Sequence, residues 1–315
     1  MKKTKRGEIL EKGKERRKRR LRHYLIPIIA IVWTGVFTAL LFSMLEQRKQ
    51  ADDTYRELVA DTVMFRHSGK ATANANRMQK GNTTASDFPA LSESENEKES
   101  TDSLTSVTFD YPKLKIDFAK LRAINSDFIC FLYIPALDCA YPVVHSADNS
   151  EYLTKDFYGK RSPDGAIFLD RYSSPDFSDA NSLIFGHNMR SGSMFGCLKR
   201  FYKDETLADK SPYFYLYTDT GVRRYQIFGY GQISTEDSLY SLSTDYENEE
   251  TYDNLIERVR GFSPHLQDKE GTDFKLRPPI VTLSTCYGNG STRFVVFGAL
   301  TGQEVDESQD TDPDS

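Results

Sequence analysis

Residues 280–300 read IVTLSTCYGNGSTRFVVFGAL and carry the strongest structural signal in the chain. Two β-rich runs, Pro279–Cys286 and Arg293–Leu300, flank a polar, glycine-rich loop, which is typical of two strands that pair as a hairpin. This pairing brings Cys286 and Arg293 to the facing ends of the two strands. A cysteine at a strand end beside an accessible loop is a candidate nucleophile, and the alternative is a buried, inert thiol.

Six more β-rich runs precede this hairpin, each bounded by Gly, Pro, Asp or Asn. Eight short strands separated by turn residues are typical of a β-barrel or a β-sandwich, so the sequence predicts a mainly β fold. The six runs are Phe128–Ile134, Ala140–Val144, Gly165–Leu169, Ser182–Phe185, Phe214–Thr218 and Val222–Ile233.

Two helices are expected in the same part of the chain. A short one spans Asp117–Ile124, where Asp117 is a suitable N-terminal cap. A longer one, of about four turns, spans Thr244–Gly261 ahead of the cysteine strand, with a capping box at its start and Gly261 at its end. One apolar face of this longer helix is formed by Tyr252, Leu255, Ile256, Val259 and Phe262.

The N-terminal region has the composition of a membrane anchor. Residues 1–24 carry a net charge of +9 while the whole chain carries −5, so the remainder carries −14. The run Leu25–Leu45 holds 21 residues without a charge, enough to cross a hydrocarbon core of about 30 Å. Since the basic residues precede this run, we expect residues 1–24 in the cytoplasm and the rest outside. The alternatives are a buried core helix and a cleaved signal peptide.

Between the anchor and the β-rich region, the pattern changes twice. Residues 46–66 have a narrow apolar stripe with helical spacing, which predicts a stalk helix or an element packed on the folded domain. Residues 68–106 are rich in Ser, Thr, Asn and Glu and predict a flexible tether, so that 46–108 links anchor and domain. The folded domain is expected at 109–301, followed by an acidic, disordered tail at 302–315.

Composition excludes several classes of function. An acidic body argues against nucleic-acid binding. No C-x-x-C pair, metal-ligand cluster or phosphate-binding loop occurs, so we expect no metal and no cofactor. The chain has four cysteines, far fewer than a disulfide scaffold. Besides Cys286 they are Cys130, Cys139 and Cys197, which we expect to be buried thiols.

A cysteine nucleophile needs a base and a group that stabilises the developing oxyanion. His187 follows an apolar run that ends in glycine, so it lies at the rim of the predicted β scaffold. His145 and His265 remain alternatives on position alone. The guanidinium of Arg293 suits the oxyanion, although a strand-edge arginine paired with a carboxylate is equally compatible with the pattern.

Three motifs together resemble the sortases, most closely class B. They are Thr282-Leu-Ser-Thr-Cys286, Arg293 on the next strand, and Phe185-Gly-His-Asn-Met189 about a hundred residues earlier. The resemblance covers about 110–301, and the long helix before the cysteine strand and the basic, anchor and tether segments agree with it. Further matching segments are Ile124-Asn-Ser-Asp, Leu132-Tyr-Ile-Pro135, Tyr141-Pro-Val-Val144, Asp148-Asn149, Tyr152-Leu153 and Gly165-Ala-Ile-Phe-Leu-Asp170.

The resemblance implies a fold and an activity. Sortases have an eight-stranded β-barrel and are cysteine transpeptidases of the thiol endopeptidase class. They cleave the C-terminal sorting signal of a secreted surface protein after a threonine, through a thioacyl intermediate that an amine resolves. Class B implies a signal of the NPxTN or NPxTG type and an amine of a peptidoglycan precursor or cross-bridge. Cys286 is then the nucleophile, His187 the acid and base, and Arg293 the oxyanion ligand.

Residues next to these three are candidates for substrate binding. Ser284, two positions before the cysteine on the same strand, is expected on the same face. Thr285, Tyr287 and Asn188 adjoin Cys286 and His187, and packing is the alternative role for each. The loop of six residues between Cys286 and Arg293 is short for the family, which implies a narrower groove or different contacts on the leaving side.

Other functions remain as alternatives. A sortase that polymerises pilin would use a lysine amine as acceptor, although 68–106 lacks the aromatic lid motif of such enzymes. A non-catalytic surface-binding domain would lack one of the three catalytic residues, and all three are present. A papain-like hydrolase would place its cysteine at the start of a helix and its histidine later in the chain.

Overall fold

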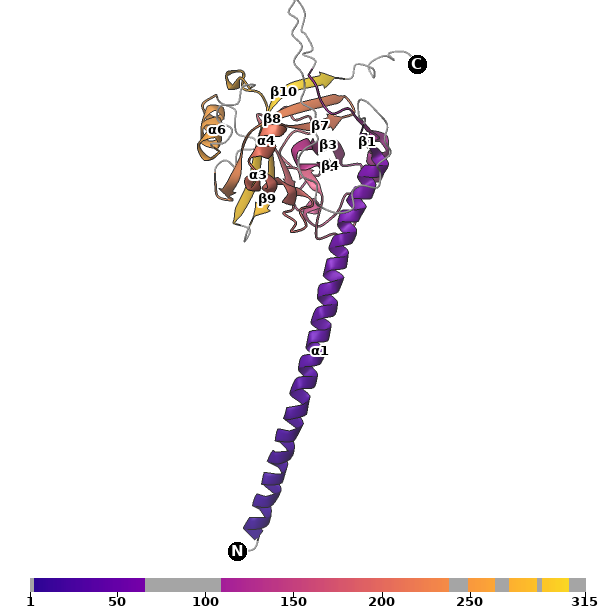
Figure 1. Ribbon diagram of the computed structural model, residues 1–315, viewed down its shortest axis with the longest axis vertical. Helices are drawn as coiled ribbons and strands as arrows, with labels where there is room; N and C mark the ends of the chain where they lie inside the picture. Colours follow the sequence, from indigo (N-terminus) through magenta and orange to yellow (C-terminus); the bar gives the residue numbers. More distant parts are fainter. Residues whose placement is uncertain (1–2, 66–108, 238–248, 264–271, 288–290, 306–315) are drawn as a thin grey trace, which may run out of the picture. The chain divides into compact units, whose positions relative to one another are not determined.

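The computed structural model describes residues 3–65, 109–237, 249–263, 272–287 and 291–305. The chain divides into two compact units, Met1–Arg56 and Glu57–Ser315. The first unit holds most of helix α1 (Lys3–Thr62), shown in indigo in Figure 1. Among the described residues, α1 contains a window, Ile29–Glu46, that is long and apolar enough to cross a membrane, and 0% of this window is buried.

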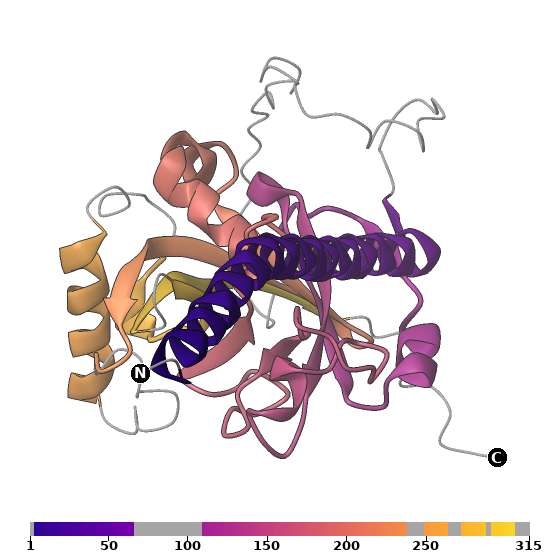
Figure 2. The ribbon, with the colours of Figure 1, turned by 90° about the horizontal axis from the view of Figure 1, so that it is seen from below.

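The second unit is built on a closed barrel of eight strands (Figures 1 and 2). Each of the eight runs predicted from the sequence forms one of these strands, and the predicted barrel is confirmed. Around the barrel the order is β10-β8-β7-β3-β4-β5-β6-β9. The strands are β3 (Phe128–Ile134), β4 (Cys139–His145), β5 (Ile167–Leu169), β6 (Asn181–Gly186), β7 (Tyr213–Thr218), β8 (Gly221–Ser234), β9 (Ile280–Tyr287) and β10 (Thr292–Val305).

Short helices connect the strands. Helix α2 (Phe118–Ile124) begins as predicted, because the Asp117 carboxylate accepts a hydrogen bond of 2.9 Å from the Lys120 N–H. The other connecting helices are η1 (Pro135–Leu137), η2 (Glu151–Leu153), η3 (Phe195–Lys199), α3 (Arg200–Lys203), α4 (Thr206–Lys210) and η5 (Phe274–Leu276).

The stalk helix ends earlier than the sequence predicts. Helix α1 stops at Thr62, and the next three residues form β1 (Val63–Phe65), which pairs with β2 (Leu114–Ile116). Val63 is buried in this small sheet, and Asp117 donates its N–H to the Thr62 carbonyl over 2.9 Å. Residues 63–65 therefore form a strand and not the last part of the predicted helix, because they pair with a segment about fifty residues later. The predicted tether at 68–106 lies outside the described residues.

The C-terminal strand runs further than predicted. Gly302–Val305, expected to begin the disordered tail, continue β10 and pair with the first residues of β8, up to Val305 opposite Gly221. The acidic composition of this segment favoured a disordered tail. Its backbone instead pairs with β8, and the local sequence pattern does not reveal this pairing. Residues 306–315 lie outside the described part of the chain.

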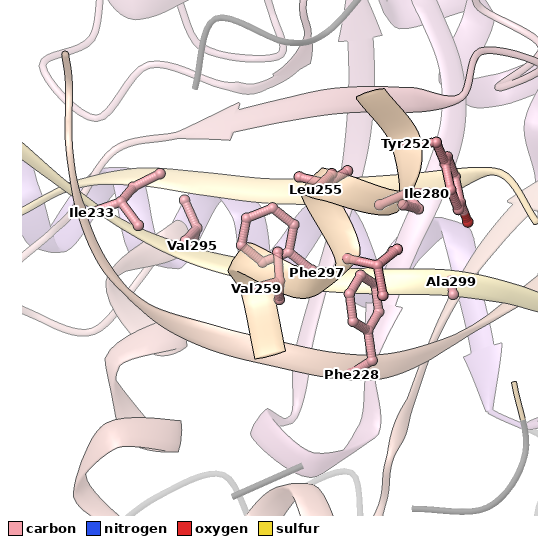
Figure 3. Packing of buried hydrophobic residues seen from close by; sticks show 10 residues of the cluster. Phe228, Ile233, Tyr252, Leu255, Val259, Ile280, Val295, Phe297 and Ala299 are labelled. Carbon is pink, nitrogen blue, oxygen red and sulfur yellow. The ribbon is translucent and has the colours of Figure 1, made fainter. Parts of the chain in front are cut away.

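Helix α6 (Glu249–Phe262) covers one side of the barrel, as Figures 1 and 2 show. The predicted helix is confirmed from Glu249 onward, whereas its expected capping box falls in 238–248, outside the described residues. Four predicted apolar positions on α6 are at most 3% exposed, and Figure 3 shows helix residues packed on the side chains of β8, β9 and β10. The contacting set comprises Tyr252, Leu255, Ile256 and Val259 on α6 and Phe228, Ile233, Ile280, Val295, Phe297 and Ala299 on the strands.

Candidate active site

The strand register brings the three predicted catalytic residues to one end of the barrel. Strand β9 lies between β6 and β10, and Arg293 of β10 pairs directly with Cys286 of β9. On the other side, β6 runs parallel to β9, and its last residue, Gly186, pairs with Thr285. His187 is the next residue after Gly186, so it lies level with Cys286. Backbone positions alone therefore place His187, Cys286 and Arg293, the three predicted catalytic residues, side by side.

The ring of His187 is held by a backbone carbonyl. Its Nε2 atom lies 2.7 Å from the carbonyl oxygen of Leu153. A carbonyl oxygen only accepts hydrogen bonds, so Nε2 carries the proton of the neutral ring and Nδ1 has the free lone pair. The residue as a whole is partly exposed.

Side-chain hydrogen bonds hold the turn that supplies this carbonyl, η2, at its start and at its central residue. At its start, the Asp148 carboxylate accepts hydrogen bonds from Ser150 and from the N–H of Glu151. These bonds hold the pKa of Asp148 below its usual value, the Ser150 hydroxyl being the largest cause. Within η2, the Tyr152 hydroxyl donates to Asp127 over 2.7 Å, and burial is the largest cause of the raised pKa of Tyr152.

Gly165 allows η2 and the His187 ring to lie close to each other. Gly165 has φ +59°, and a Cβ there would lie 3.0 Å from Cδ2 of His187 and would collide with the Tyr152 carbonyl oxygen. Only glycine adopts this conformation without strain and leaves the space that the ring occupies. Gly165 therefore contributes directly to the position of the His187 ring.

Helix η3 and the residue before it contact the two chain neighbours of His187, Gly186 and Asn188. A Cβ at Gly186 would lie 2.7 Å from the Phe195 ring of η3. Beyond His187, Asn188 forms an isolated β-bridge with Met194, the residue just before η3. Met194 is buried with φ 50° and ψ −138°, a strained backbone conformation for a residue with a Cβ, and its N–H donates to the Tyr141 hydroxyl over 2.8 Å.

Comparison with known proteins agrees with this geometry. The family model of the sortase domain matches residues 132–301, more than half of the chain. The chain belongs to the sortase family. Members of this family are cysteine transpeptidases, and the matched region contains β6, β9 and β10 with the residues described above.

The similar proteins indicate the class. Sortase B of Listeria monocytogenes is 26% identical over 193 residues, which cover 60% of this chain and 75% of that protein. The crystal structure of Clostridium perfringens sortase B matches with a TM-score of 0.53 and 28% identity, over 58% of this chain and 99% of that one. A Staphylococcus aureus sortase B–substrate complex matches with a TM-score of 0.52 and 25% identity, over 58% of this chain and 83% of that one. Within the sortase family, the chain is thus similar to sortase B proteins.

Topology separates His187 from His145, one of the two other candidate histidines. Strand β4 is parallel to β5, and β5 is antiparallel to β6, so β4 and β6 run in opposite directions. His145, the last residue of β4, therefore lies towards the end of the barrel where β6 begins, away from Cys286. His265 falls in 264–271, outside the described residues.

The predicted substrate-binding residues differ in accessibility. Ser284 and Thr285 are 0% and 1% exposed, which favours packing over contact with a peptide. Asn188 is partly exposed and stays a candidate. The side chains of Tyr287 and of Cys286 itself lie outside the described part of the structure. Since the apolar face of α6 is buried on the barrel, its four described apolar residues do not line an open groove.

Sequence reasoning missed two groups that position the histidine, the Leu153 carbonyl and Gly165. Both lie in segments that match the family, but a backbone carbonyl leaves no chemical signal in a sequence. An isolated glycine inside a predicted strand was the one available signal, since it often marks a close approach of the backbone to another group. Among the described residues, no three His, Cys, Asp or Glu side chains are grouped to hold a metal ion.

Proposed function

We propose that this sortase uses Cys286 as nucleophile, His187 as acid and base, and Arg293 to stabilise the oxyanion. The observation that supports this assignment is the register of β6, β9 and β10, in which His187 and Arg293 flank the cysteine position from opposite sides. Neighbouring strands hold their residues about 5 Å apart, which suits proton transfer and oxyanion binding around one reacting carbonyl.

The proposed reaction has two halves. The Cys286 thiolate attacks the threonine carbonyl carbon of the sorting signal, and the arginine donates to the oxyanion. The amide C–N bond breaks when His187 protonates the leaving amine, which leaves a thioacyl enzyme. His187 then takes a proton from the incoming amine, which attacks the thioester and releases the thiolate. The hydrogen bond to Leu153 makes Nδ1 the nitrogen that transfers these protons.

For the substrates, we propose a sorting signal of the NPxTN or NPxTG type and a peptidoglycan amine, from a precursor or a cross-bridge. The similarity to sortase B proteins supports this choice of signal. The joined product is a surface protein linked through its threonine to the cell wall. An acceptor lysine on a pilin subunit is the alternative.

For the location, we propose a single-pass anchor with a cytoplasmic N-terminus and an extracellular catalytic domain. The apolar window of α1 and the basic residues before it support this orientation. The catalytic domain and its surface-protein substrates then share one side of the membrane.

Peptide cleavage tests the proposal. The full chain in detergent micelles is incubated with quenched fluorescent peptides that contain NPQTN, NPKTG, PPKTG or LPETG, and with a peptidoglycan-type amine or a lysine peptide as acceptor. We expect cleavage and transfer with an NP-type peptide, lost in Cys286→Ala. Preference for LPETG would contradict the class B signal, and preference for the lysine acceptor would favour pilin polymerisation. Activity that persists in Cys286→Ala would refute the nucleophile.

A further inference from the structure

Two cysteines outside the proposed catalytic site meet inside the protein. Cys139 begins β4 and Cys197 lies in η3, and both are buried free thiols, as predicted, with 3% and 7% exposure. Their sulfur atoms are 3.0 Å apart, closer than ordinary contact. A disulfide bond measures about 2.05 Å, so the two atoms need to approach by only about 1 Å to form one.

The segments that carry these cysteines are already joined by two other bonds. The Arg200 guanidinium donates to the Leu137 carbonyl over 2.7 Å. The Met194 N–H donates to the Tyr141 hydroxyl. The start of β4 and the region of η3 are therefore held together on both sides of the sulfur pair, and a covalent bond requires no large movement of either segment.

Helix η3 is also the support of the segment that carries His187. Phe195 lies against Gly186, and Asn188 bridges to Met194. In the thiol form Cys197 also donates to the Met194 carbonyl over 3.1 Å, a hydrogen bond that a disulfide would replace by a covalent link to β4. A bond at Cys197 would thus restrain the turn between His187 and η3.

We propose that Cys139 and Cys197 form an intramolecular disulfide that clamps this turn and holds the catalytic histidine in place. The sulfur geometry is independent of the proposed membrane orientation, but the oxidising surroundings in which the bond would persist depend on it. Cys130 is buried in β3, and no other sulfur of a described residue lies within hydrogen-bonding distance of it.

The oxidation balances with a low-molecular-weight disulfide such as oxidised glutathione. One thiolate attacks it to give a mixed disulfide and one glutathione thiol, and the second cysteine displaces the other glutathione. The protein loses two hydrogens in total, and two glutathione thiols form.

The folded environment makes this exchange slow. The hydrogen bond with Cys197 and burial raise the pKa of the Cys139 thiol well above its usual value. Because the thiolate is the attacking species, we expect the bond to form while the domain folds or opens, and to resist reduction once it is buried.

Peptide mapping of the full chain tests the proposal. Cys286→Ala protein in detergent micelles is incubated with oxidised glutathione in mild urea, returned to buffer, blocked with N-ethylmaleimide and digested without reduction. We expect one cross-linked peptide pair holding Cys139 and Cys197, two hydrogens lighter than the free pair, while Cys130 reacts with maleimide after denaturation. Maleimide or separate glutathione on both cysteines would overturn the disulfide.

Hydrogen exchange tests the clamp on the same Cys286→Ala sample, oxidised or reduced, so that neither Cys139 nor Cys197 is replaced. In the oxidised form we expect the backbone amide hydrogens of residues 187–194 to exchange at least about threefold more slowly than in the reduced form. We also expect the melting temperature of the oxidised form to be about 5 °C higher or more. Cys130→Ala is the control variant and should keep both differences. A cross-link that leaves the exchange of 187–194 unchanged would overturn the clamp.

Discussion

Gly165 has no side chain, yet it determines where the His187 ring can lie. Besides its positive φ, a Cβ at this position would collide with the Tyr152 carbonyl oxygen and lie 3.0 Å from Cδ2 of the ring, which leaves no room for a methyl group. The carbonyl of Leu153 completes the arrangement, because it fixes which ring nitrogen carries the proton. At the scale of single residues, the position of the proposed base thus depends on backbone atoms.

Gly165→Ala should lower both activity and stability. The added methyl group must displace the ring or η2, and an L-residue at this φ is strained, so we expect a loss of about 1–3 kcal/mol in unfolding free energy and at least about tenfold in kcat/KM. Gly159→Ala is the matched control, since Gly159 also has a positive φ of 72° but nothing lies within 4 Å of its Cβ position. Equal loss of activity in the two variants would argue against a role for ring contact.

Arg293 should not be replaceable by lysine. A guanidinium offers several donors in a fixed plane, whereas an ammonium offers a point charge on a flexible stem, so directed contact with an oxyanion is lost. We expect Arg293→Lys to lower kcat by about 10²-fold or more with an unchanged melting temperature. The measurement is steady-state transpeptidation beside thermal unfolding. Near-wild-type kcat would show that charge alone is enough.

At the scale of elements, α6 packs against the outside of the barrel at the hairpin that carries Cys286. It packs on β8, β9 and β10 through Leu255 and its neighbours (Figure 3). Gly229 of β8 allows the close approach, because a Cβ there would collide with Val259. The hydroxyl of Tyr252 donates to the Pro278 carbonyl over 2.7 Å, just before β9 begins. The helix therefore stabilises β9, the strand that carries the proposed nucleophile.

Leu255→Ala should destabilise the domain. Leu255 is 1% exposed, and removing a buried leucine side chain costs about 2–5 kcal/mol. The control is Asn254→Ala on the exposed face of the same helix, for which we expect a change within about 0.5 kcal/mol. Chemical denaturation of the two variants gives the comparison. Similar stabilities would mean that α6 is only loosely attached to the barrel.

At the scale of the whole molecule, the catalytic unit includes the end of α1. It begins at Glu57, and Leu58 and Val63 are buried at 2% and 4% exposure. Lys120 and Asp61 form an ion pair of 2.5 Å that links α2 to this segment. The folded unit thus starts well before Phe109, where the β-rich pattern begins.

A chain that begins at Glu57 should be more stable than one that begins at residue 68. The shorter chain loses β1 and two buried apolar side chains, which together contribute about 3–5 kcal/mol. Thermal and urea unfolding of the two chains measure the difference, with Met64→Ser in the longer chain as a control, because Met64 is exposed. Equal stability would show that β1 is dispensable.

The sequence by itself determined the eight strands, the longer helix from Glu249, the Asp117 cap and the Cys286–Arg293 hairpin. Each of these rests on short-range periodicity, capping or turn chemistry, which neighbouring residues express directly. The burial of Cys130, Cys139 and Cys197 likewise followed from the ordinary preference of free thiols. Position alone favoured His187 but left His145 and His265 open, and the family resemblance then selected His187.

The tertiary structure alone decided which distant segments meet. The parallel pairing of β6 with β9 joins residues about a hundred positions apart and sets His187 beside Cys286. The β1–β2 sheet, the Leu153 carbonyl and the contact of Cys139 with Cys197 are of the same kind. The pairing of β6 with β9 depends on barrel closure, because backbone hydrogen bonds between strands carry little sequence information and the closed arrangement of all eight strands selects the partners, whereas β1 and β2 form a separate sheet outside the barrel.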